Sequence, residues 1–243
     1  MTLYPAASLH ASWTDKNMDS VASESSLQAY PRVAVDAILF TIADRELKAL
    51  LVKIKKGPFC GFWAFPGGLV QVGESLDEAA RRELHEKTGV QDLYLEQLYT
   101  FGDAQRDPLA HTVAVAYFAL VPYFDHALHH GEKYEDVGWF PVRALPHLAY
   151  DHNAIAACAL KRLQAKLGYT NIVYSLLPRE FTLAELQEIY EIILHKQLDR
   201  RNFRRKILTL GLLKPLAKTR RGAHRPAVLY TFTRRSPMNV EVL

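Results

Sequence analysis

Two acidic residues in the segment 68–90 have the type and spacing to do chemistry. Glu83 and Glu86 are three positions apart in a stretch of helical periodicity, so they would share one face of a helix. On a helical wheel this face also carries Leu76 and two alanines, which we expect to be buried. A buried carboxylate is costly unless a cation or donor meets it. The pair could therefore hold Mg²⁺ bound to a diphosphate, or the two side chains could simply reach water at the helix rim.

The residues on either side of these acids predict how the chain presents them. Gly67 and Gly68 permit a tight backbone turn where a phosphate could approach. Ser75 and Glu78 have the spacing of a capping box, and Gly89 is a typical helix stop. The segment is therefore predicted to be a loop followed by one well-terminated helix.

Length and composition limit the class of protein. A chain of 243 residues with 49% hydrophobic residues can form one large domain or two smaller ones. Its two cysteines, Cys60 and Cys158, are too few for a disulfide framework or a zinc site, which fits a reducing compartment. We see no signal peptide and no apolar run near the roughly 18 residues of a membrane span. We expect a cytoplasmic protein with no membrane partner.

The net charge of +4 is unevenly distributed. From Asn171 onward lie 14 of the 30 Lys and Arg residues but only 6 of the 26 Asp and Glu residues. That segment therefore has a net charge of +8, and the part before it has −4. A mildly acidic part followed by a strongly basic one is typical of a ligand-binding or enzyme domain joined to a nucleic-acid-binding domain. A basic surface that serves only solubility is the alternative.

The first two thirds of the chain read as an α/β domain. Residues 1–30 are aperiodic and are predicted to be a flexible arm. Apolar β-type runs predict five strands and one long helix, with Asp151 as the helix N-cap, and an aromatic strand within 61–68 leads into the segment 68–90. The strands are Arg32–Ile42 and Leu47–Ile54, which form a hairpin, then Leu93–Phe101, Thr112–Val121 and Val137–Pro141; the helix is Asn153–Leu167.

Two basic residues in loops of this domain could bind an anion. Arg106 lies in the loop 102–111, where Pro108 fixes a turn, and its guanidinium suits a phosphate or a carboxylate. An ordinary polar turn explains this loop equally well. Lys55 follows a predicted strand and could neutralise a diphosphate, although such lysines are usually part of a solvated loop.

The basic C-terminal part has the order of a winged helix-turn-helix. Thr182 and Glu185 make a capping box for a first helix. Asp199 can cap a second helix, in which Phe203 and Ile207 are predicted to be buried. Two strands around a basic Gly/Pro turn would form the wing. A solvated basic face on a small helical domain is the alternative, and RNA binding fits less well because no aromatic platform interleaves the arginines.

In this interpretation the second helix enters the major groove and the wing holds phosphates or the minor groove. The residues expected to contact DNA are polar or basic and lie on these two elements. They are Arg200, Arg201, Asn202, Arg204, Arg205 and Lys206 on the helix, and Lys218, Arg220, Arg221 and Arg225 in the wing.

The spacing Gly-x5-Glu-x7-Arg-Glu-Leu-x-Glu-x-x-Gly-Val from Gly68 to Val90 resembles the Nudix box. This is the signature of hydrolases that act on nucleoside diphosphates linked to another group. The chain departs from it once, with Lys87 where the pattern has a second Glu that is commonly a metal ligand. A Lys ammonium cannot coordinate Mg²⁺. The resemblance implies an α/β/α sandwich with a mixed sheet over residues 31–168, with no catalytic residue and no metal site, which holds its ligand but hydrolyses it poorly or not at all.

A second, longer pattern is more specific. The imperfect box, together with Phe181-Thr-Leu-x-Glu-Leu-Gln and Leu198-Asp-x-Arg-Asn-Phe-Arg-Arg-Lys206, resembles the NrtR family of Nudix-related transcriptional regulators of NAD metabolism. The resemblance implies a bacterial repressor with a winged-helix domain over 169–243, palindromic operators near NAD-biosynthesis genes, and a homodimer. It implies ADP-ribose as effector and no required cofactor. The residues we expect around ADP-ribose are Gly67, Gly68, Glu83, Glu86, Arg106, Asp107 and Lys55.

Two other functions fit the same residues. A working ADP-ribose pyrophosphatase with a nucleic-acid-binding tail is possible because Glu83 and Glu86 could together hold one metal ion. A DNA-binding protein that senses no ligand is the weaker reading.

Overall fold

The structure is a computed structural model that describes residues 30–89, 94–123, 134–221 and 226–240. The side chains of Lys87 and Thr88 also lie outside the described part, as does most of the predicted arm at 1–30. Residues from Arg32 onward form one compact unit, which is described here.

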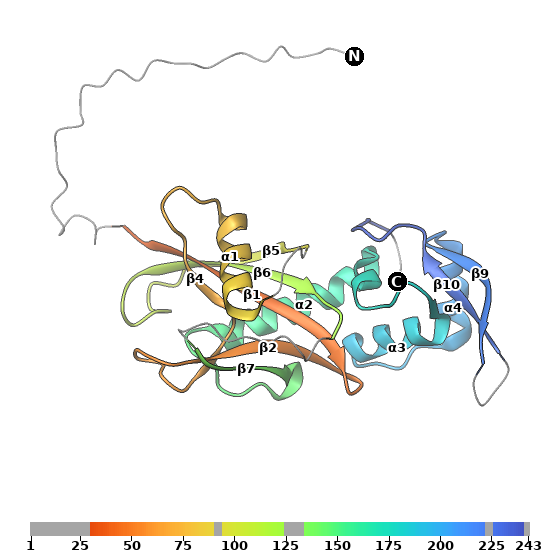
Figure 1. The fold of residues 1–243 in the computed structure, drawn as a ribbon, viewed down its shortest axis with the longest axis horizontal. Helices are drawn as coiled ribbons and strands as arrows, with labels where there is room; N and C mark the ends of the chain where they lie inside the picture. The colour runs from red at the N-terminus through yellow and green to blue at the C-terminus, as the bar shows by residue number, and fades with distance from the viewer. Residues whose placement is uncertain (1–29, 90–93, 124–133, 222–225, 241–243) are drawn as a thin grey trace, which may run out of the picture. The chain divides into compact units, whose positions relative to one another are not determined.

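The N-terminal part of this unit is a seven-stranded mixed sheet (Figure 1). Its order is β3-β2-β1-β6-β5, with β4 also paired to β1 and β7 to β2. The central strands β1 and β6 are parallel, whereas the other pairs are antiparallel. The strands are β1 (Arg32–Ala43), β2 (Glu46–Ile54), β3 (Trp63–Ala64), β4 (Gly67–Leu69), β5 (Glu96–Phe101), β6 (Thr112–Leu120) and β7 (Tyr134–Pro141).

Both faces of the sheet are covered, as expected from the apolar residues that point to both sides of β1. Alternate residues of a strand point to opposite faces. Ile38 and Phe40 pack into the core that contains helix α2 (His152–Tyr169). Ala37 and Leu39 pack on the other side, in the cluster that contains Leu84 of helix α1 (Leu76–Thr88). The predicted α/β/α sandwich is confirmed.

Local signals placed the ends of α1 correctly. Ser75 and Glu78 form both bonds of the capping box, and Gly89 closes the helix in the left-handed conformation at φ 72°. The predicted hairpin is also present, because Ala43 pairs with Glu46 across a two-residue turn. Neither turn residue is glycine, yet Asp44 and Arg45 both have positive φ, the backbone of a type I′ turn.

The C-terminal part is a winged helix-turn-helix. Helices α3 (Leu183–Leu194) and α4 (Arg200–Thr209) follow the capping residues Thr182 and Asp199, whose side chains each accept a backbone N–H bond. The wing is a three-stranded sheet of β8 (Phe181–Thr182), β10 (Ala227–Phe232) and β9 (Leu213–Arg220), in that order. Phe203 and Ile207 are buried as predicted.

Several details differ from the sequence-based expectations. The short strands β4 and β8 and the 3-10 helices η2 (Val142–Ala144) and η3 (Ile172–Ser175) were not predicted, because pieces of two to four residues carry no periodicity. The aromatic strand predicted within 61–68 is present as the two-residue β3. Asp151 precedes α2, but its side chain makes no capping bond. Within the described ranges no helix is long and apolar enough to cross a membrane.

Candidate ligand cavity and nucleic-acid interface

A cavity of about 400 Å³ opens between the central strands, β4, the loop 102–111 and the start of α2. Its wall combines aromatic rings, glycine backbone and charged groups, the mixture expected of a small-molecule site. The residues that line it are Arg32, Ala34, Asp36, Ile54, Lys56, Ala64, Phe65, Gly67, Gly68, Leu69, Arg106, Asp107, Leu109, Thr112, Tyr134, Tyr150 and His152.

Arg106 lies in this wall, but its guanidinium is already bound. Its Nε and Nη2 donate to the two carboxylate oxygens of Asp151, at 3.0 and 2.6 Å. This bidentate pair is the strong form of an Arg–carboxylate contact, and it explains why Asp151 does not cap α2. Arg106 therefore ties the loop 102–111 to the start of α2, a role that its position in the sequence does not reveal.

Asp36 and His152 form a second polar group in the cavity. The backbone N–H of Phe65 donates to Nδ1 of His152 at 2.9 Å. Burial lowers the pKa of His152, so the ring is neutral. With Nδ1 as acceptor, the ring proton must be on Nε2, which lies 3.5 Å from Oδ1 of Asp36. Asp36 is 6% exposed, and its other oxygen lies 3.7 Å from Nη2 of Arg106.

The Nudix-like box contributes a carboxylate at the edge of this cavity. Glu83 is 2% exposed, as predicted, and Arg82 donates to its Oε1 at 2.7 Å. Arg82 also donates through two nitrogens to Glu74. This contact, together with the backbone N–H of Gln71, holds the pKa of Glu74 at about 2. The box thus forms one connected ion-pair network.

The structure brings only part of the predicted ligand set together. Gly67, Gly68, Arg106 and Asp107 line the cavity, and Glu83 adjoins it through Gly68. The prediction that both acids of the box point inward is wrong for Glu86, which is 51% exposed. The helical wheel placed it beside Ala79, which is buried, but the side chain of Glu86 extends to solvent and lies 3.7 Å from Arg82.

Two other residues of that set take different roles. Lys55 is exposed and does not line the cavity, whereas the neighbouring Lys56 does. Asp107 lines it, but its carboxylate accepts hydrogen bonds from the backbone of Leu109 and the hydroxyl of Thr112. Asp107 therefore shapes the loop that forms one wall.

Sequence reasoning missed the aromatic and histidine residues of the cavity. Tyr150 and His152 lie two positions apart in the stretch 148–152, and Tyr134 comes from β7. None of the three was assigned to the ligand, because no feature of its own marks it as a cavity residue. Burial raises the pKa of Tyr134 well above its ordinary value, helped by the charges of Glu83 and Asp36, so its hydroxyl stays protonated. Asp36 could have been found, because it is the acidic residue in an otherwise apolar strand.

The fit of this site to a metal ion can be tested on its side chains. Among the residues described, no group of three or more His, Cys, Asp and Glu side chains could hold a metal ion. The three glutamates of the box instead surround Arg82, whose nitrogens lie 2.6 Å from Glu74, 2.7 Å from Glu83 and 3.7 Å from Glu86. Lys87, the departure from the Nudix pattern, has a side chain outside the described part. The described residues therefore do not form a metal site.

The second helix of the winged part presents its polar residues to solvent. Arg200, Arg201, Asn202, Arg205 and Lys206 are exposed. Nη2 of Arg205 donates to Oδ1 of Asn202 at 2.8 Å, which aligns two side chains able to read base edges. Arg204 is half-buried. This face of α4 therefore has the composition and exposure of a recognition helix.

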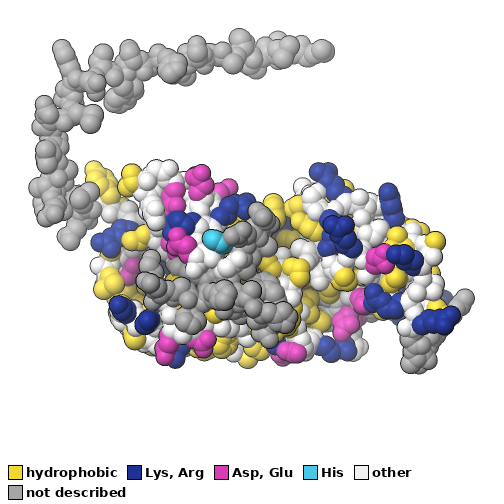
Figure 2. All heavy atoms as spheres, in the orientation of Figure 1, with side chains coloured by type: hydrophobic (Ala, Val, Ile, Leu, Met, Phe, Trp, Pro, Cys, Tyr) yellow, Lys and Arg dark blue, Asp and Glu magenta, His cyan; other side chains and the backbone are white. Residues whose placement is uncertain are grey.

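Two basic residues of the wing pair with acids, one just before β8 and one in the first turn of α3. Nζ of Lys218 lies 2.7 Å from Glu180, and Arg220 pairs with Glu185, the capping residue of α3. Arg221 is exposed, whereas Arg225 lies outside the described residues. Figure 2 shows Lys and Arg side chains spread over the winged-helix part, with fewer acidic ones between them.

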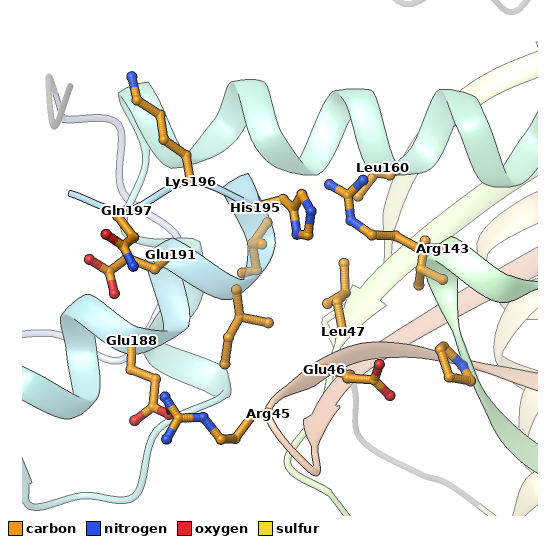
Figure 3. A pocket seen from close by; sticks show the side chains of 14 residues that line it. Arg45, Glu46, Leu47, Arg143, Leu160, Glu188, Glu191, His195, Lys196 and Gln197 are labelled. Atoms are coloured by element: carbon orange, nitrogen blue, oxygen red, sulfur yellow. Dashed lines mark ion pairs between the residues drawn. The ribbon is translucent and has the colours of Figure 1, made fainter.

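A second cavity, of about 450 Å³, lies where the β1–β2 hairpin meets the end of α3 (Figure 3). Its floor includes Leu47 and Ile193, and Arg45 of the hairpin pairs with Glu188 of α3 at 3.0 Å. Gln164 of α2 donates to the carbonyl of Ile193 at 3.0 Å. The hairpin and α2 thus both contact the winged part.

Comparison with known proteins agrees with these two parts. Residues 30–163 match the NUDIX domain, and residues 173–232 match the NrtR DNA-binding winged helix domain. The chain belongs to the NrtR family. It is 38% identical to the "ADPR responsive transcriptional repressor NtrR" of Acinetobacter baylyi over 206 residues, which are 83% of this chain and 82% of that protein.

Two solved structures of the NrtR family are also similar. The crystal structure of Shewanella oneidensis NrtR complexed with a 27mer DNA has a TM-score of 0.72 and 38% identity, covering 83% of this chain and 93% of that one. The NUDIX domain of the same NrtR, complexed with ADP ribose, has a TM-score of 0.51 and 36% identity, covering 58% of this chain and 99% of that one. The NrtR winged-helix match at 173–232 begins within η3 and ends at β10, so it contains the whole wing.

Proposed function

We propose that this protein is a bacterial transcriptional repressor that binds duplex DNA through its winged helix and senses ADP-ribose in its Nudix domain. The observation that carries the proposal is the joining of both sites in one compact unit: a cavity of nucleotide size and an exposed basic recognition helix. The Acinetobacter relative is named for the same response.

The finer parts of the proposal concern the assembly and the target. We place the protein in the cytoplasm as a homodimer that binds palindromic operators of NAD-metabolism genes, with no required cofactor. Two recognition helices one DNA turn apart leave little tolerance for a change in their separation. ADP-ribose would act by preferring one arrangement of the dimer over another.

Within the cavity, we assign the binding of the diphosphate to basic side chains that have no carboxylate partner. Arg106 is held by Asp151, so it contributes mainly by positioning the loop. Among the described residues of the wall, Arg32 and Lys56 have no carboxylate partner. They are therefore better placed than Lys55 to neutralise phosphate, whereas Gly67 and Gly68 lie against the carboxylates of Asp36 and Glu83.

The proposal is tested by DNA binding with and without the effector. A duplex that the purified protein selects from a random-sequence library is labelled, and its affinity is measured by fluorescence anisotropy. We expect millimolar ADP-ribose to change the Kd at least fivefold, within the range of typical coupling energies. An unchanged Kd would show that ADP-ribose is not the effector. If the protein selected no duplex from the library, the proposal that it binds specific DNA sequences would be wrong.

We further propose that the Nudix domain is not a working hydrolase, because Lys87 replaces an acid of the box. The rival is an ADP-ribose pyrophosphatase with a nucleic-acid-binding tail. Turnover of ADP-ribose with Mg²⁺ separates the two: we expect little cleavage by the wild type and more by Lys87→Glu. Rapid Mg²⁺-dependent cleavage by the wild type would support the rival.

A further inference from the structure

Asp36 is a carboxylate that the surrounding protein does not satisfy. It lies in strand β1, is 6% exposed and lines the ligand cavity. Nε2 of His152 lies 3.5 Å from its Oδ1, and Nη2 of Arg106 lies 3.7 Å from its Oδ2. Both distances exceed the usual 2.7–3.2 Å of an N–H···O hydrogen bond. Within the described residues, no donor makes a hydrogen bond of normal length to this carboxylate.

A buried carboxylate without hydrogen bonds is costly, so such groups normally meet a donor. Here the neighbours cannot move closer easily. Arg106 is fixed by its bidentate pair with Asp151, and His152 is fixed by its bond from Phe65. On the remaining side, a Cβ at Gly67 would lie 2.2 Å from Oδ1, so the strand β4 already touches the carboxylate. The donor must therefore come from the cavity.

The chemistry of the donor follows from the charge of Asp36. A carboxylate accepts hydrogen bonds and repels phosphate, so the phosphates of a nucleotide ligand must lie elsewhere in the cavity. Two adjacent hydroxyl groups match the two oxygens of one carboxylate. We propose that Asp36 binds the vicinal diol of a ribose, and that it thereby selects ligands carrying an intact ribose. The inference rests on the proposed function, since it describes how the same cavity reads its effector.

The test uses the full-length protein and isothermal titration calorimetry. We expect Asp36→Asn to weaken ADP-ribose about ten- to a hundredfold, the usual effect of losing a hydrogen bond to a charged group. Inorganic pyrophosphate, which carries no ribose, should bind the variant as it binds the wild type. Asp103→Asn is the matched control: it removes the same charge from the adjacent loop, outside the cavity wall, and should change affinity less than twofold.

Two ribose units could supply the diol, and separate probes distinguish them. AMP carries the adenosine ribose and ribose 5-phosphate carries the terminal one. We expect Asp36→Asn to weaken one of these probes and to leave the other unchanged. The wild type should in addition discriminate at least tenfold against the deoxy analogue of the ribose so identified, a measurement that does not depend on how the variant folds.

Three results would overturn the inference while the proposed function stands. They are an ADP-ribose affinity within twofold of wild type in Asp36→Asn, an equal loss for pyrophosphate and ADP-ribose, and wild-type indifference to deoxy analogues of both riboses. If the wild type bound none of the ribose-containing probes, the effector assignment would fail as well.

Discussion

Gly68 and Glu83 are in such close contact at the edge of the cavity that a side chain on Gly68 would collide with the carboxylate. A Cβ placed on Gly68 would lie 2.3 Å from Oε1 of Glu83 and 2.5 Å from its carboxyl carbon. Real Cβ contacts are essentially never this short, so any larger residue at this position must displace the carboxylate of Glu83, whereas the backbone conformation of Gly68 does not itself call for glycine. The loop and the helix of the Nudix-like box are thus fitted to each other.

Replacing Gly68 with alanine should therefore destabilise the protein. The added methyl group must displace Glu83, which is 2% exposed and bonded to Arg82. We expect a loss of about 1–3 kcal/mol in the free energy of unfolding, typical of overpacking. Urea denaturation measures it. Gly102→Ala is the control, because its Cβ would meet only Val113 at 3.8 Å, and an equal loss there would contradict this explanation.

The Glu74–Arg82 pair predicts how stability depends on pH. Its hydrogen bonds lower the pKa of Glu74 from 4.5 to about 2 in the folded protein. A carboxyl group with a depressed pKa stabilises fully above its unfolded value, and this contribution is lost as the pH falls toward the folded value. We expect Glu74→Gln to lower Tm at pH 7 and the difference from wild type to shrink between about pH 4.5 and 2.

The pH series of thermal melts has its own control. Glu46→Gln removes an exposed carboxylate for which no ion pair is seen among the described residues, and we expect it to melt like the wild type at every pH. Parallel Tm curves for wild type and Glu74→Gln across the acid range would show that the pair does not cause the acid sensitivity.

The recognition helix predicts a specific salt dependence of DNA binding. Arg201 is exposed and points away from the buried Phe203 and Ile207. If Arg201 contacts a phosphate, Arg201→Ala should reduce the slope of log K against log salt concentration by about 1. If Arg201 contacts a base edge, the variant should bind its preferred duplex about 1–3 kcal/mol more weakly and discriminate less between sequences. Titrations at several salt concentrations distinguish these.

Lys161→Ala is the matched charge deletion for this experiment. Lys161 is exposed on α2, outside the winged part, and should leave both the affinity and the slope unchanged. A similar loss in both variants would mean that general positive charge, and not the helix face, binds the duplex.

Whether a feature could be predicted from the sequence depended on how many positions separate the residues that form it. Helix ends are set by residues three positions apart, so the capping boxes at Ser75 and Thr182 were predicted correctly. The winged-helix order was also predicted, because each of its parts has a local signal. The predicted burial was correct for Glu83 and wrong for Glu86, since a helical wheel gives the direction of a side chain but not what covers it.

The cavity itself was only partly predictable. The pairing of Arg106 with Asp151 was not predicted, because the two residues are 45 positions apart in the sequence. Neither residue shows this in its local context. The same holds for His152, whose tautomer depends on a backbone N–H at Phe65. Long-range pairing of this kind follows from topology, which a single sequence does not specify.

The alternation of β1 has a consequence for how this protein can change by mutation. Asp36 lies on the same face as Ile38 and Phe40, while Ala37 and Leu39 lie on the opposite face. A slip of one position in the pairing of β1 would turn the acid toward α1 and bury it among aliphatic groups. A chain paired in the shifted register would therefore lose both the position of Asp36 in the cavity and the packing of β1 against the two helices. A mutation that favours this shift would impair stability and ligand binding at the same time.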